Sequence, residues 1–83
     1  MRESVSRARL FELLNAQLTE YSGCEDCRFD GPLFRLREPD FDGANWSDVI
    51  TLQCSGRTAG PCLDHAPYAI AIVRKRYNLV KTD

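Results

Sequence analysis

Apolar residues recur every three or four positions across residues 5–21, which is the spacing of one face of an α-helix. The members of this stripe are Val5, Ala8, Phe11, Leu14, Leu18 and Tyr21. Ser4 or Ser6 can accept a hydrogen bond from a backbone N–H in the first turn. Gly23 suits the left-handed turn that commonly ends a helix. The pattern therefore predicts an amphipathic helix near the start of the chain.

Two later segments alternate apolar and polar residues, which is typical of strands with one buried face. In the first, residues 32–37, Phe34 and Leu36 are expected to face inward. In the second, residues 48–54, the expected inward residues are Ile50, Leu52 and Cys54. The segment between them is rich in proline, glycine, asparagine and aspartate, which favour turns. We therefore predict an antiparallel hairpin with a long, acidic connection.

A second helical stripe follows near the C-terminus, at Ala66, Ile70, Val73 and Tyr77. Asp64 can cap a helix over about residues 65–77, because its carboxylate accepts a backbone hydrogen bond.

The expected fold is one small α+β domain with the order helix, β-hairpin, helix (α-β-β-α). Residues 1–23 would supply the first helix, residues 24–62 a cysteine knuckle, the hairpin and a loop, and residues 63–83 the last helix and a tail.

The four cysteines are the strongest chemical signal in the chain. They fall in two pairs, Cys24 with Cys27 and Cys54 with Cys62, and His65 follows the last one by three residues. Zinc takes four tetrahedral ligands, thiolate is a preferred one, and a Cys-x-x-Cys turn supplies two. We therefore predict one structural zinc ion per chain, held by the four cysteines, with His65 as an alternative ligand in place of Cys54.

This layout resembles the treble-clef and zinc-ribbon groups of small zinc domains. In treble clefs a Cys-x-x-Cys knuckle precedes a β-hairpin, and the first turn of the next helix supplies two further ligands. Cys24 and Cys27 match the knuckle, and Cys62 and His65 match the helix-start pair in spacing. Cys54 is an additional thiol relative to that pattern. The resemblance implies a structural zinc site.

Two other interpretations of the cysteines stay open. Cys24 and Cys27 could be the dithiol of a redox protein, although Glu25 and Asp26 between them disfavour a thiolate. Alternatively, the cysteines could be buried structural residues of a metal-free globular domain. A core of this size contributes only about 3–5 kcal/mol, so a metal or cross-link would matter for stability.

Charge and aromatic residues suggest where a partner could bind. The net charge of −1 gives no general attraction to nucleic acid or membranes. Residues 38–65 carry five acidic residues and one arginine, whereas residues 66–83 carry four basic residues and one aspartate. The candidate partner-binding residues are Arg74, Lys75 and Arg76, for nucleic acid, and Phe41 and Trp46, for a protein.

The sequence favours a small, non-enzymatic, zinc-binding interaction or adaptor domain. A protein partner is favoured over nucleic acid, and no nucleophile motif accompanies the single histidine. No segment has the roughly 18 consecutive apolar residues of a membrane span. Residues 1–20 lack the apolar core of a secretory signal. We therefore expect a cytoplasmic protein, where clustered cysteines serve metals more often than disulfides.

Overall fold

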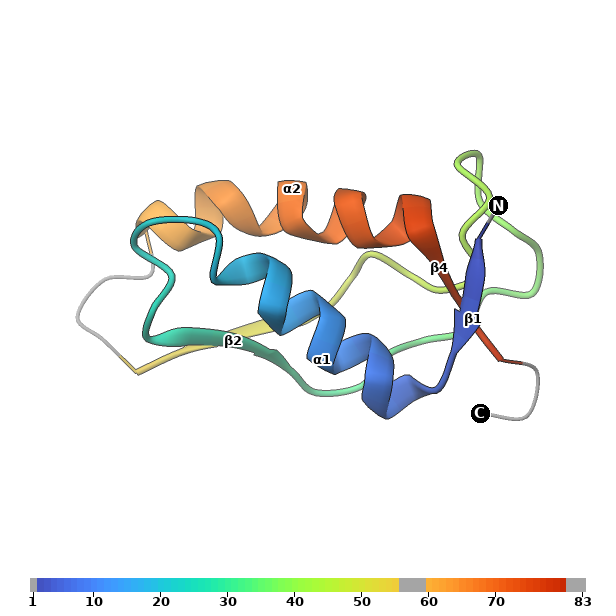
Figure 1. The fold of residues 1–83 in the computed structure, drawn as a ribbon, viewed down its shortest axis with the longest axis horizontal. Coiled ribbons are helices and arrows are strands. Elements are labelled where there is room, and N and C mark those ends of the chain that lie inside the picture. The colour runs from blue at the N-terminus through green and yellow to red at the C-terminus, as the bar shows by residue number, and fades with distance from the viewer. Residues whose placement is uncertain (1, 56–59, 81–83) are drawn as a thin grey trace.

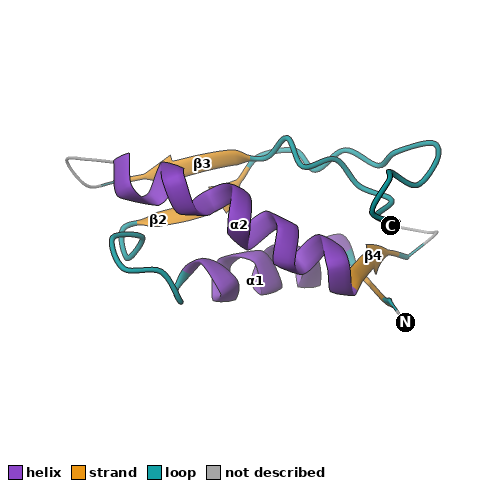
Figure 2. Ribbon diagram, turned by 90° about the horizontal axis from the view of Figure 1, so that it is seen from above, coloured by secondary structure: helices purple, strands orange, loops and turns teal. Residues whose placement is uncertain are grey.

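Two helices lie side by side, with a two-stranded sheet toward each end of the molecule (Figures 1 and 2). The computed structural model describes residues 2–55 and 60–80. Its elements are β1 (Glu3–Val5), α1 (Arg7–Leu18), β2 (Cys27–Asp30), β3 (Thr51–Cys54), α2 (Gly60–Arg76) and β4 (Tyr77–Leu79). The expected small domain of mixed helices and strands is confirmed, but its order differs, because a short strand lies before α1 and another after α2.

The first helix begins one residue after Ser6, whose hydroxyl accepts a hydrogen bond from the Arg9 N–H at 3.1 Å. This bond satisfies one of the backbone donors that a helix start leaves without a partner. Leu10, Leu14 and Leu18, four residues apart, form the buried face. The helix ends earlier than Gly23, which instead takes a positive φ of 92° in the turn that follows.

The hairpin uses a different first strand from the one expected. β2 pairs antiparallel with β3, with Phe29 opposite Leu52. The expected strand over residues 32–37 contributes a single bridge, between Arg35 and Trp46. The ladder is interrupted at Gly31, where the chain bends and φ is 93°, but Arg35 still lies opposite Trp46 in the register of β2 and β3.

The segment after Gly31 keeps the alternation of β2, in which Phe29 faces the core, because alternate residues of an extended chain point to opposite sides. Leu33 is buried, whereas Phe34, which we expected to face inward, is 56% exposed. In β3 the expected alternation is confirmed. Leu52 and Cys54 are half-buried, and Thr51 and Gln53 are exposed.

The second helix starts at Gly60, earlier than expected, so Asp64 lies inside it and is not its cap. A proline at position 61 is tolerated because the first turn of a helix leaves its N–H groups unpaired. Ala66, Ile70 and Val73 of the expected stripe are buried. The chain then passes directly into β4, which pairs in parallel with β1 and brings the two ends of the described chain together.

Two asparagine side chains bond to the outer edges of the sheets. The amide of Asn15 accepts from the Phe29 N–H at 2.6 Å and donates to the Phe29 carbonyl at 3.3 Å. The amide of Asn45 does the same for Leu79 of β4, at 2.8 Å and 3.0 Å. These bonds fix α1 against β2 and the acidic loop against β4.

No helix in residues 2–55 or 60–80 is both long and apolar enough to cross a bilayer.

Candidate functional site

The four cysteines form two disulfides in place of the predicted zinc site. Cys24 is bonded to Cys62, with their Cα atoms 4.9 Å apart, and Cys27 to Cys54, with theirs 4.0 Å apart. Zinc binding requires thiolates, whereas these sulfurs are joined to each other. Among the residues that the structure describes, no group of three or more His, Cys, Asp and Glu side chains could hold a metal ion. The zinc prediction is therefore wrong, and the metal-free domain with structural cysteines is favoured.

The strand register explains one of the two bonds. Cys27 lies opposite Cys54, and the Ser55 N–H donates to the Asp26 carbonyl at 3.0 Å just outside that pair. Cys27 and Cys54 therefore occupy a non-hydrogen-bonded position of the ladder, where facing side chains are closest. Cys24 is bonded to a cysteine of α2 and not to Cys27, so the Cys-x-x-Cys run is not the dithiol pair of a redox centre in this structure.

The disulfides also correct the expected cytoplasmic location. Disulfides persist in oxidising environments and are rare in the cytosol, where thiols are kept reduced. Two of them in one small domain indicate an extracellular or secreted environment.

His65, the alternative zinc ligand, stacks its ring on Tyr21 with the ring centroids 4.9 Å apart.

The acidic loop folds into a tight turn over residues 40–44, which we call the Phe41 turn. The Asp40 carbonyl accepts from the Gly43 N–H at 2.8 Å, and the Asp40 N–H donates to the Ala44 carbonyl at 2.9 Å. Gly43 has a φ of 89°, a conformation that residues with a side chain rarely adopt. Phe41, at the tip of this turn, is 95% exposed.

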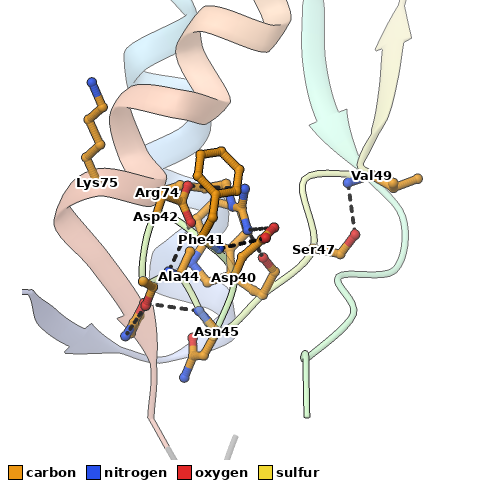
Figure 3. A network of polar contacts seen from close by, with 12 residues as sticks. Asp40, Phe41, Asp42, Ala44, Asn45, Ser47, Val49, Arg74 and Lys75 are labelled. Atoms are coloured by element: carbon orange, nitrogen blue, oxygen red, sulfur yellow. Dashed lines mark hydrogen bonds and ion pairs between the residues drawn. The ribbon is translucent and has the colours of Figure 1, made fainter. Parts of the chain in front are cut away.

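Arg74 of α2 is bonded to the Phe41 turn (Figure 3). Its Nη2 donates to Asp40 Oδ2 and to the Trp46 carbonyl, both at 3.0 Å, and its Nη1 lies 3.2 Å from Asp42 Oδ2. The guanidinium also lies over the Trp46 ring, 5.7 Å from its centroid. Arg74 is itself only 4% exposed, whereas the Asp40 and Asp42 side chains are 41% and 19% exposed, so the contacts reach from the interior to the surface. Such charge-assisted hydrogen bonds are stronger than neutral ones.

The environment of Asp40 favours its ionised form. The Phe41 N–H donates to Asp40 Oδ1 at 2.8 Å and is the largest cause that lowers the pKa of this carboxyl, followed by the hydrogen bond from Arg74. Burial acts in the opposite direction but is outweighed. The ion pair between Asp40 and Arg74 is therefore expected to persist in mildly acidic solution.

A groove of about 450 Å³ lies between the Phe41 turn and α2, and we call it the Phe41 groove. Its lining residues are Phe41, Asp42, Asp48, Val49, Pro67, Ile70, Ala71 and Arg74. Val49 is 71% exposed. Phe41 and Val49 are therefore two large apolar side chains that line the groove and are open to solvent. The arrangement can accept an apolar side chain with charged groups at its margin.

The structure separates the partner-binding residues that the sequence suggested. Phe41 is exposed, whereas Trp46 is fully buried and donates its Nε1–H to the Tyr77 carbonyl at 3.0 Å. In the basic triplet, Arg74 is buried under the loop, while Lys75 and Arg76 are exposed. The binding roles of these residues stay predictions, but Trp46 and Arg74 now support the Phe41 turn from inside.

Sequence reasoning missed the other components of the site. It interpreted Asp40 and Asp42 as ordinary residues of an acidic turn, and it placed Val49 on the outer face of a strand. The one available signal was a basic residue on an otherwise apolar helical stripe, Arg74 directly after Val73, which suggests a buried charge with acidic partners.

Comparisons with protein-family models, with curated proteins and with solved structures found no match to this chain. The function is therefore argued from the residues of the Phe41 groove themselves.

Proposed function

We propose that this protein is a small, non-enzymatic binding domain, cross-linked by two disulfides, that holds a protein partner in the Phe41 groove. The observation that carries the proposal is Phe41 itself, a phenylalanine 95% exposed on a turn that ion pairs fix to α2. An isolated exposed apolar residue is ordinary, but one held rigidly at the wall of an apolar groove is typical of an interaction site.

Rigid presentation favours binding for an energetic reason. Immobilising a mobile side chain or loop on association costs about 0.5–1.5 kcal/mol for each flexible side chain. The hydrogen bonds of Asp40 and Asp42 already order the backbone around Phe41, so much of that cost is met during folding. Aromatic residues that fill or flank pockets also supply a large share of the energy at interfaces.

A protein partner fits this surface better than nucleic acid. Nucleic-acid binding requires several cations that reach phosphates together. Arg74 is occupied by Asp40 and Asp42, and Arg76 lines a separate cavity of about 180 Å³ between α1 and α2.

The test is selection of peptides from a random heptapeptide library displayed on phage, with the oxidised protein immobilised. Selected peptides are then synthesised, and their Kd is measured against wild type, Phe41→Ser and Phe34→Ser. Phe34 is the matched control, because it is an exposed phenylalanine that does not line the groove. We expect Phe41→Ser to weaken binding at least tenfold and Phe34→Ser to leave it unchanged. Selected peptides that bind Phe41→Ser as tightly as wild type would contradict the proposal.

A further inference from the structure

We infer that the segment bound in the Phe41 groove carries a lysine or arginine next to a bulky apolar residue. This inference rests on the proposed function and adds the chemistry of the partner. It follows from the distribution of charge around the groove, where unpaired carboxylate charge lies on one side and cations lie on the other.

The apolar part of the inference comes from the groove wall. The aliphatic surface of the groove comes from the segment just before β3 and from α2, at Val49, Pro67, Ile70 and Ala71. The volume of about 450 Å³ lies within the roughly 300–1,000 Å³ of ordinary ligand pockets. Space of this size accepts a bulky side chain together with part of its neighbours in an extended segment.

The charged part comes from the carboxylates. Asp48 lines the groove and is exposed, and its carboxylate makes no hydrogen bond or ion pair with the residues that the structure describes. Asp64 lies on the same side of α2 as Pro67 and Ala71, three and seven positions before them. Asp40 and Asp42 add two carboxylates, and the single cation among them, Arg74, is buried beneath the turn.

The nearby cations lie on the other side of the Phe41 turn. Arg2 donates from Nη1 to the Lys75 carbonyl at 2.9 Å, and its guanidinium lies within about 3.0 Å of where a Cβ on Gly43 would stand. Figure 3 shows Lys75 and Val49 on opposite sides of the turn. Arg2 and Lys75 therefore offset the negative charge on the side of the turn that carries Gly43. The opposite side, which carries Asp48, stays acidic. A bound cation would lie at Asp48, with its apolar neighbour against Phe41 and Ala71.

The same selection tests this inference, with Asp48→Asn as the variant and Asp26→Asn as its control. Asp26 is also an exposed aspartate, but it lies beside the Cys27–Cys54 disulfide, away from the groove. We expect the selected peptides to pair a basic residue with a bulky apolar one. Asp48→Asn should weaken their binding about fivefold, as an exposed ion pair does, and Asp26→Asn should not. Raising the salt concentration should weaken binding to wild type more than binding to Asp48→Asn.

The outcomes separate this inference from the proposed function. Selected peptides without basic residues, or an equal Kd for wild type and Asp48→Asn, would overturn the inference alone, provided that Phe41→Ser still weakens binding at least tenfold. Equal weakening by both aspartate variants would indicate attraction to overall charge and would also overturn it. Binding that does not depend on Phe41 overturns both. Melting curves for every variant confirm that each is compared in its folded state.

Discussion

Arg74 is the residue on which the site depends, although it is almost fully buried. One guanidinium contacts two carboxylates, a backbone carbonyl and the Trp46 ring, which joins the acidic loop to α2 and to the core. Its Nε is buried without a hydrogen-bond partner among the described residues, so the arrangement is not fully satisfied. Removing one partner from such a set of buried charges is costly, because the remaining charges lose their compensation.

Replacing Arg74 with methionine should loosen the Phe41 turn. The substitution keeps the apolar stem but leaves Asp40, Asp42 and the Trp46 carbonyl without their donor. We expect a loss of about 2–3 kcal/mol in the free energy of unfolding, measured by urea denaturation. Arg76→Met is the control, because Arg76 is exposed and lies in the same last turn of α2. Equal stability of the two variants would show that the ion pairs do not hold the loop.

The lowered pKa of Asp40 sets the direction of a pH effect. A carboxyl whose pKa is lower in the folded than in the unfolded state contributes stability at neutral pH, and this contribution is lost as the pH falls through the folded-state pKa. We therefore expect the Asp40 carboxyl carbon, followed by NMR, to titrate below the pKa of an ordinary aspartate. The Phe41 amide signal should shift with the same midpoint, because that N–H donates to Asp40. An ordinary midpoint for Asp40 would contradict this prediction.

At the scale of elements, the sequence predicted the helices better than the strands. Both helices carry apolar stripes over several turns, such as Leu14 with Leu18 and Ala66 with Ile70, and such stripes are hard to mistake. β1 and β4 have three residues each, too few for an alternation to stand out. Each of these strands forms only by pairing with the other, and the two lie near opposite ends of the sequence, so no local pattern predicts them.

The cysteine pairing illustrates a different limit of sequence reasoning. Spacing along the chain shows that thiols are numerous, but zinc ligands and disulfides differ only in how the fold brings the sulfurs together. The sequence pattern did not predict β2, so it gave no reason to place Cys27 on a strand opposite Cys54. The Phe41 turn was visible as an acidic loop, but its contact with Arg74 spans more than thirty positions and no local pattern predicts it.

The whole molecule is elongated, with extents of 38 × 19 × 17 Å, and it is fastened toward both ends. Toward one end, the Cys24–Cys62 bond joins the turn after α1 to α2, and the Cys27–Cys54 bond joins β2 to β3. Toward the other end, β1 pairs with β4 (Figure 1). The Cys24–Cys62 bond is inside the core, where its cysteines are 1% and 0% exposed, whereas Cys27 and Cys54 are half-buried at the surface of the hairpin. The two disulfides therefore differ in their access to solvent.

We expect reductants to break the Cys27–Cys54 bond first, because thiol exchange requires an attacking thiolate to reach a sulfur atom. The protein would be treated with increasing dithiothreitol, alkylated, and mapped by mass spectrometry. Intermediates alkylated at Cys27 and Cys54 should precede any labelling of Cys24 and Cys62. Labelling of Cys24 and Cys62 should coincide with unfolding, since their bond lies among core side chains. Simultaneous labelling of all four would contradict this order.

The asparagine amides at Phe29 and Leu79 have a consequence for how the protein behaves at high concentration. An edge strand with unpaired N–H and C=O groups can start a fibril, because a strand of another molecule can pair with it and then offer a new edge. At Phe29 and Leu79, both the N–H and the carbonyl that such a chain would use are already bonded to Asn15 and Asn45. Each amide therefore occupies main-chain groups on one edge of its sheet, the edge formed by β2 or by β4. We therefore expect the edges at Phe29 and Leu79 not to add a further strand, even at high protein concentration.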